Sequence, residues 1–306
     1  MDVKTLFVFP GQGTQTIGMG ADLVRDFPIA KTVFEEVDDA LHTKLSHLIF
    51  QGDLSELSLT ENAQPAIMTV SMAVVRILES EGIKIKDAVA GHSLGEYSAL
   101  CAAGVLTLEQ TAILLQKRGQ AMGRACAVAK SGMLALLGAT PEQAQEIAES
   151  AQVYVANDNA PGQIVLSGLL SHLDRAKEIA TQMNIKRAIS LQVAGGFHSP
   201  LMQSAADEMA DVLKEVKFLP AQVPVYCNVT AQKEMDPRCF APLLTTQIVA
   251  PVRWRELIQN TSATHFVECG PGAVLSGLIK RIVPTAETVN IGTSESVTAF
   301  IKQINS

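Results

Sequence analysis

The sequence predicts an α/β fold with a mainly parallel sheet, and three observations carry that prediction. Short continuous apolar runs, at residues 6–9, 88–90, 223–226, 266–269 and 289–291, are typical of strands buried on both faces. Stretches with apolar residues at helical spacing, such as residues 67–78 and 205–216, separate these runs. Strands that alternate with helices are typical of a parallel sheet covered by helices.

The middle of the chain has a different order of elements. Its patterns follow one another as strand, helix, strand, strand, helix and strand, which is the ferredoxin-like order. The segments are, along the chain, residues 133–137, 140–150, 153–156, 164–167, 173–183 and 188–193. We therefore expect a small ferredoxin-like subdomain at residues 127–195, inserted into a large α/β catalytic domain built from residues 1–126 and 196–306.

Two local signals support the order within this subdomain. Thr140 is a typical N-cap, Pro141 suits the first helical position, and Gln143 completes a capping box, so a helix is expected to begin here. Residues 157–162, Asn-Asp-Asn-Ala-Pro-Gly, are rich in turn formers and predict a loop between the second and third strands.

Composition narrows the classes of function. Of the 306 residues, 47% are hydrophobic and 18% charged, which allows a large buried core. The net charge of −7 argues against nucleic acid as the main partner, because phosphate binding needs a surplus of Lys and Arg. No apolar run reaches about 18 residues, and the one ending at Pro10 is too short for a signal peptide, so we expect no membrane span and a cytoplasmic protein.

The five cysteines lie far apart and form no C-x-x-C pair. Most have apolar neighbours, which indicates buried reduced thiols, and a single cysteine nucleophile is the alternative.

Residues 91–95, Gly-His-Ser-Leu-Gly, fit the G-x-S-x-G nucleophile elbow. A strand at 88–90 leads into them and a helix at 96–103 leads out, and the turn between is too tight for side chains at its flanking glycines. Ser93 is therefore expected at a helix N-terminus, where free N–H groups stabilise an oxyanion. In this context Ser93 is the expected nucleophile of an acyl transfer; outside it the same pattern would be an ordinary turn.

A serine nucleophile needs a base, and the chain has six histidines. His198 lies in the loop 195–200, Gly-Gly-Phe-His-Ser-Pro, after the last subdomain strand, where functional residues concentrate. His92 adjoins Ser93, but neighbours on a sharp turn point apart, so it is expected to line the pocket or to serve the structure.

Two further features stay open on the residues alone. The loop Pro10-Gly11-Gln12-Gly13 follows the first strand and can bring an amide near the nucleophile, although such a loop is commonly only a turn. Arg118 lies near the end of an apolar helix, and from spacing alone it is an ordinary snorkelling arginine.

These residues fall within eight segments that extend over essentially the whole chain: residues 9–15, 60–66, 91–100, 118–119, 157–163, 197–202, 251–254 and 268–272. In content and order the segments resemble the bacterial malonyl-CoA:acyl carrier protein transacylases, and eight ordered matches are specific. The resemblance implies a hydrolase-like α/β core with a ferredoxin-like insert, which agrees with the pattern of elements.

The resemblance also implies catalytic roles. Ser93 is the nucleophile and His198 its base. Gln12 and the backbone N–H of Leu94 form the oxyanion hole, and Gln247 offers its backbone carbonyl to His198. A carbonyl in place of the usual carboxylate still fixes the histidine tautomer, although it stabilises the imidazolium less.

For the substrate, the resemblance implies that Arg118 pairs with the free carboxylate of malonyl. A planar guanidinium can hold both carboxylate oxygens, and an acetyl group would leave it unpaired, which gives discrimination. Gln12, Gln64 and Asn159 are expected in the substrate site, and the ring of Phe197 limits room for an α-methyl branch.

Two departures from the family pattern stand near these residues. Ala194-Gly195-Gly196 carries more glycine than is usual before Phe-His, so this loop is expected to be more mobile. Ser131-Gly132-Met133 stands where Gly-Ala-Met is common.

The activity implied is ping-pong transfer from malonyl-CoA, through a malonyl-serine, to the phosphopantetheine thiol of acyl carrier protein, by a monomer with no bound cofactor or metal. Since carrier proteins are generally acidic, a basic docking patch is expected. Its candidates are Lys117, Lys186, Arg187, Lys280 and Arg281.

Other functions stay open. A free-standing acyltransferase of a polyketide synthase has the same chemistry with a different carrier, and a malonate decarboxylase transfer subunit is similar. A serine esterase uses the same elbow and would need an acid, for which Asp158 or Asp174 is available although neither is well placed. A non-catalytic module that binds the carrier is the last alternative.

Overall fold

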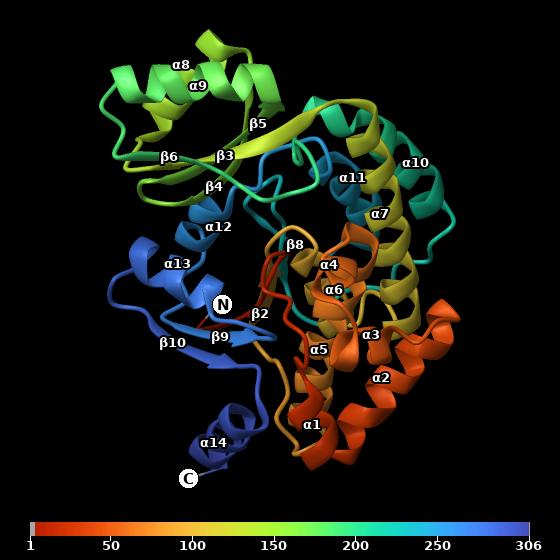
Figure 1. The fold of residues 1–306 in the computed structure, drawn as a ribbon. Coiled ribbons are helices and arrows are strands. Elements are labelled where there is room, and N and C mark those ends of the chain that lie inside the picture. The colour runs from red at the N-terminus through yellow and green to blue at the C-terminus, as the bar shows by residue number, and fades with distance from the viewer. Residues whose placement is uncertain (1–3, 306) are drawn as a thin grey trace.

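The computed structural model describes residues 4–305 and contains two sheets surrounded by helices (Figure 1). The larger sheet has six strands in the order β10-β9-β1-β2-β7-β8. All neighbours in it are parallel except β7 and β8. Its strands are β1 Thr5–Phe9, β2 Ala88–Gly91, β7 Val225–Tyr226, β8 Lys233–Glu234, β9 His265–Cys269 and β10 Glu287–Ile291. The predicted α/β class with a mainly parallel sheet is confirmed.

Helices cover both faces of this sheet, which explains the continuous apolar runs. Along β1, Leu6 and Val8 pack into one cluster with the helices near the C-terminus, whereas Phe7 and Phe9 pack into the main core. The helices are α1 Ala21–Asp26, α2 Pro28–Leu41, α3 Leu45–Gln51, α4 Leu54–Leu57, α5 Thr60–Ser80, α6 Gly95–Ala102, α7 Leu108–Val128, α10 Gln203–Lys214, α11 Pro237–Gln247, α12 Trp254–Gln259, α13 Val274–Ile282 and α14 Ser294–Asn305, with the 3-10 turn η1 Pro200–Met202.

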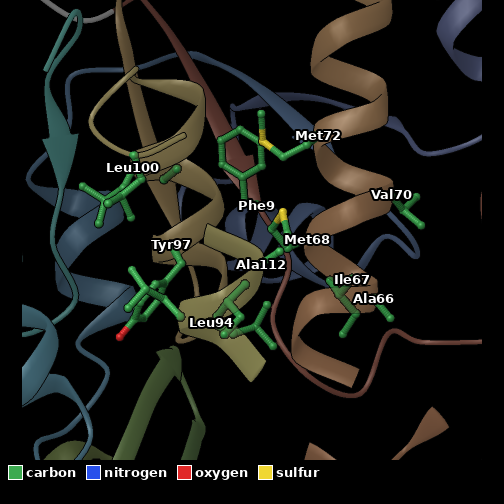
Figure 2. Packing of buried hydrophobic residues seen from close by; sticks show 14 of the residues in the cluster. Phe9, Ala66, Ile67, Met68, Val70, Met72, Leu94, Tyr97, Leu100 and Ala112 are labelled. Atoms are coloured by element: carbon green, nitrogen blue, oxygen red, sulfur yellow. The ribbon is translucent and has the colours of Figure 1, made fainter. Parts of the chain in front are cut away.

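The main core positions the elbow. Figure 2 shows the ring of Phe9 close to Met68 and Met72 of α5, with Leu94 and Tyr97 in the same cluster. Leu94 and Tyr97 are almost fully buried. Because Leu94 lies within the G-x-S-x-G turn and Tyr97 follows it, their burial fixes the start of α6 against the sheet.

The second sheet has four antiparallel strands in the order β4-β5-β3-β6. Its elements, at the top of Figure 1, are β3 Ser131–Leu137, α8 Pro141–Ala151, β4 Tyr154–Ala160, β5 Gln163–Leu169, α9 Leu170–Gln182 and β6 Arg187–Ser190. This is the expected ferredoxin-like order, and α8 begins with the expected capping box of Thr140 and Gln143. We propose residues 127–195 as the inserted subdomain and 1–126 with 196–306 as the large domain; residues 1–3 and 306 lie outside the described chain.

One local prediction is wrong. The turn-rich residues 157–162 do not form a long loop, because β4 continues to Ala160 through two register shifts against β5. The large domain supports this irregular stretch: Asn157 forms a parallel bridge with Val252, and Asp158 N–H donates to the carbonyl of Val252. The Asp158 carboxylate also pairs with Arg255 of α12 at 2.6 Å. Tertiary hydrogen bonds therefore override the local turn preference.

Candidate active site

The turn between β2 and α6 holds Ser93 in the left-handed region, with φ of 54°. Glycine is required on both sides: a Cβ on Gly91 would lie 1.9 Å from the backbone of Gly95, and one on Gly95 would lie 2.2 Å from the carbonyl of Phe9. Asn228 fastens the turn, since its Oδ1 accepts from Ser93 N–H and its Nδ2 donates to the carbonyl of Gly91, both at 2.7 Å. This is the geometry of a nucleophile elbow.

Ser93 and His198 meet although 105 residues separate them in the chain. The distance from Ser93 Oγ to His198 Nε2 is 2.8 Å, and His198 Nδ1 lies 2.8 Å from the backbone carbonyl oxygen of Gln247. A carbonyl can only accept, so the ring proton is on Nδ1 and Nε2 is free to accept from the serine. Burial, with the Arg118 cation, lowers the pKa of His198 to about 3, so the ring is neutral near pH 7.

Arg118 of α7 is a buried cation, with 1% of its surface exposed. Its guanidinium donates to Gln64 Oε1 at 2.8 Å, to Gln247 Oε1 at 3.0 Å and to Ser93 Oγ at 3.2 Å. Within residues 4–305 no carboxylate forms a salt bridge with it, and its Nε has no hydrogen-bond partner. Burial lowers its pKa. The interpretation of Arg118 as a snorkelling surface residue is therefore wrong.

A buried guanidinium without an anion is costly, because the charge has lost its water without gaining a counter-ion. An arrangement of this kind favours the entry of a small anionic group beside Ser93.

A pocket of about 610 Å³ lies over these residues. It brings together seven of the nine predicted site residues: Gln12, Gln64, Ser93, Arg118, Asn159, Phe197 and His198. Leu94 and Gln247 lie behind its wall, Gln247 in contact with both Arg118 and His198. Residues of β3, β4 and β5 of the small sheet line the pocket together with loops and helices outside that sheet, so the small sheet does not form it alone.

His92 lies in the wall of this pocket, as the turn geometry predicts. Its Nε2 is 2.8 Å from Asn159 Oδ1, and its ring packs edge-on against Trp254 with centroids 5.6 Å apart. Burial lowers the pKa of His92, so a neutral ring donates to the Asn159 carbonyl. Asn159, expected in the substrate site, thus also joins the small sheet to the elbow.

The two acids considered for an esterase lie elsewhere. Asp158 is paired with Arg255, and Asp174 is exposed on α9. Sequence reasoning missed two residues: Asn228, which contacts the elbow, and Glu96, whose carboxylate accepts from the backbone N–H of Asn228. Glu96 gave a signal, as a lone charge in the otherwise uncharged segment Gly95–Ala102, and Asn228 gave one as a polar residue just after a strand.

Comparison with known proteins places the site in a family. The acyl transferase domain matches residues 6–304. The chain belongs to the acyl transferase family. Within this family it is 42% identical to the malonyl CoA-acyl carrier protein transacylase of Bacillus subtilis strain 168, over 98% of this chain and 97% of the relative. The corresponding Escherichia coli K12 protein is 38% identical, over 91% and 93%.

Solved structures of acyl transferases agree with the fold. An acyl-carrier-protein-S-malonyltransferase from Bartonella henselae superposes with a TM-score of 0.95 at 45% identity, covering 99% of this chain and all of the other. A malonyl-transacylase in complex with its type II PKS acyl-carrier protein gives 0.94 at 36% identity, covering 98% and 99%.

The described acyl transferase chain, residues 4–305, has neither a candidate membrane-spanning helix nor a candidate metal site. None of its helices is long and apolar enough to cross a membrane. No group of three or more His, Cys, Asp or Glu side chains in the same residues is placed to hold a metal ion.

Proposed function

We propose that this acyl transferase moves the malonyl group from malonyl-CoA to the phosphopantetheine thiol of acyl carrier protein. One observation carries the proposal: the buried Arg118, with no anion of its own, lies 3.2 Å from the hydroxyl of Ser93. An acyl group on Ser93 that ends in a carboxylate can pair with this cation, whereas an acetyl group cannot. The names of the relatives agree with this substrate.

In the first half-reaction, Ser93 Oγ attacks the thioester carbonyl carbon while His198 Nε2 takes the hydroxyl proton. The carbon–sulfur bond then breaks, and coenzyme A leaves as a thiol with the proton from His198. The second half-reaction reverses these steps: the carrier thiol gives its proton to His198, its sulfur attacks the malonyl ester, and Ser93 is regenerated.

The oxyanion needs donors, and the Ser93 N–H is already bonded to Asn228 Oδ1. The next N–H along the chain, that of Leu94 at the start of α6, is our proposed donor, with Gln12 from the loop after β1 as the second. Gln247 would stabilise the His198 imidazolium through a carbonyl dipole, which is weaker than a carboxylate.

Seven of the nine proposed residues line one pocket of a single chain, and Gln247 contacts two of them, so we propose a monomer that acts in the cytoplasm. A polyketide carrier is the second candidate acceptor, since a structurally similar malonyl-transacylase forms a complex with a type II PKS acyl-carrier protein. An esterase in which Asp158 or Asp174 orients the histidine is disfavoured, because His198 Nδ1 contacts the carbonyl of Gln247 and neither acid.

For the carrier, we propose docking at a groove of about 410 Å³ that contains Lys186, Arg187 and Arg281. Helix α13 joins this groove to the active site: its Val274 and Leu278 line the pocket, and Arg281 follows in its last turn. An acidic carrier at the groove would therefore have a short path for its phosphopantetheine arm. Lys117 of α7, an earlier candidate, does not line the groove.

The proposal is tested by mass spectrometry of intact protein. Mixed with malonyl-CoA, the wild type should gain one malonyl group and lose it to added holo-carrier, whereas Ser93→Ala should gain none. Retained transfer by Ser93→Ala, or the absence of a malonyl adduct on the wild type, would overturn the proposal. Parallel mixing with acetyl-CoA and methylmalonyl-CoA measures selectivity, and comparison of fatty-acid and polyketide carriers identifies the acceptor.

A further inference from the structure

Glu96 is a buried acid that the transfer mechanism does not use. It lies in the first turn of α6, three residues after the nucleophile, and only 1% of its surface is exposed. One of its oxygens, Oε2, accepts from the backbone N–H of Asn228 at 2.8 Å and from Gln247 Nε2 at 2.9 Å. Burial raises its pKa to about 7. Burying a carboxylate costs free energy because it loses its hydration, so we expect Glu96 to serve a function at this position.

The side chain of Gln247 connects Glu96 to Arg118. Its Nε2 donates to Glu96 Oε2 and to the backbone carbonyl of Ser93 at 3.1 Å, so both protons of the amide are used. Its Oε1 accepts from Arg118 Nη2 at 3.0 Å. The two ends of an amide are chemically different, and a carboxylate accepts only. Glu96 therefore turns the nitrogen of Gln247 toward itself and the oxygen toward Arg118.

The opposite orientation of Gln247 would place an N–H group against a guanidinium that can only donate. Arg118 would then lose one of its three side-chain hydrogen bonds and could turn away from Ser93. Through its backbone, the same Gln247 accepts from His198 Nδ1. The orientation of its amide thus bears on the arginine without removing the contact to the base.

We propose that Glu96 is a positioning residue for acyl selection: by orienting the Gln247 amide, it aims Arg118 at the carboxylate of the acyl group on Ser93. This inference rests on the proposed malonyl transfer, and it adds a residue that touches neither substrate nor nucleophile side chain. Asn228 completes the arrangement, since its N–H holds Glu96 and its side chain holds the elbow.

The test compares two replacements of Glu96. Glu96→Gln keeps a carbonyl oxygen that can accept both hydrogen bonds of Oε2, whereas Glu96→Met has similar bulk and no strong acceptor. The readout is the ratio of kcat/KM for loading Ser93 from malonyl-CoA to that from acetyl-CoA. We expect Glu96→Gln to keep the ratio within about threefold and Glu96→Met to lower it at least about tenfold, mainly through the KM for malonyl-CoA.

Three further variants separate positioning from general damage. Arg118→Ala lacks the guanidinium and therefore gives the value of the ratio at which selectivity for malonyl is lost completely. Gln247→Met removes the amide but keeps the backbone carbonyl, so adding Glu96→Met to it should lower the ratio no further. Asp38→Leu removes another buried carboxylate, on α2, which accepts hydrogen bonds from Ser46 of α3. This variant should lower stability without changing the ratio.

An unchanged ratio in Glu96→Met, with only the melting temperature lowered, would overturn the proposal. So would a further fall in the double variant, because Glu96 would then act by another route. If Glu96→Met does not fold, a loss of more than about tenfold in Glu96→Gln overturns it as well. These failures differ from failure of the proposed function, in which the wild type itself would show no preference for malonyl-CoA.

Discussion

Burial decides what the functional side chains do. On the sequence Arg118 is one of 24 basic residues, and within residues 4–305 it is a buried cation with three side-chain hydrogen bonds and no salt bridge. His198 is similarly changed, because its buried position beside Arg118 disfavours the protonated ring. A base that stays neutral is ready to take the proton of Ser93 without first losing one of its own.

We predict that acylation of Ser93 by the substrate proceeds at its full rate well below pH 6.5. A lowered pKa extends the neutral form of a base to lower pH, and kcat/KM reports the free enzyme. Single-turnover loading from a malonyl-pantetheine thioester, which carries no titrating phosphate, measures this between about pH 4.5 and 8. Arg118→Gln removes the neighbouring cation and should move the acid limb to higher pH. A midpoint near 6.5 that remains in Glu96→Gln, which lacks the carboxyl whose pKa is raised to about 7, would contradict the assignment.

Among the elements, the segment before His198 shows a packing role for its unusual glycines. A Cβ on Gly195 would lie 2.4 Å from Cys126 Sγ, so glycine here permits close packing against α7. The expected mobility of this loop stays a prediction. The N–H of Gly196 donates to Ser131 Oγ at 3.0 Å, and Ser199 Oγ donates to the carbonyl of Gly196. The unusual Ser131 and the unusual glycines therefore belong to one contact, which holds the loop of the base against β3.

We predict that Gly195→Ala lowers the free energy of unfolding by about 1–3 kcal/mol, because its new methyl overlaps Cys126. Loading of Ser93 should slow as well, since the overlap displaces His198. Adding Cys126→Ala to Gly195→Ala should restore part of the free energy of unfolding and part of the loading rate. The matched control is Gly277→Ala on α13, where a Cβ meets nothing within 4 Å and a gain of about 0.5–1 kcal/mol is expected. Urea unfolding measures the free energy of unfolding of the wild type, the two single glycine variants and the double variant. Equal effects of the two glycine substitutions would contradict the packing argument.

In the whole molecule, the pocket depends on the two sheets being held together. The Asp158–Arg255 pair, the bridge from Asn157 to Val252 and the His92–Asn159 hydrogen bond all cross from the small sheet to the large domain. The basic groove crosses in the same way, with Lys186 just before β6, Arg187 at the start of β6 and Arg281 on α13. An acidic partner at this groove would touch both parts.

We predict that charge reversal of Lys280 and Arg281 raises the KM for holo-carrier at least about fivefold at low salt and less at high salt, because surface attraction is screened. Loading from malonyl-CoA should change much less. Lys117→Glu, an exposed charge reversal outside the groove that changes the net charge by half as much, is the control for charge reversal elsewhere on the surface. Steady-state transfer at varied carrier concentration measures the effect, and an unaltered KM in the double variant would exclude this groove.

The sequence by itself determined the class of fold, the ferredoxin-like order and the elbow around Ser93. Each of these depends on residues that are neighbours in the chain: apolar runs, capping signals and glycines whose absence of a side chain the turn requires. With the family resemblance, it also named His198 and Arg118.

Only the tertiary structure decided how these side chains work. The strand at Asn157 and Asp158, the close packing at Gly195 and the contacts of Gln247 with Glu96 and Arg118 all join segments distant in the chain. No local pattern encodes such contacts, because burial, hydrogen-bond direction and pKa depend on what the folded chain places around each group.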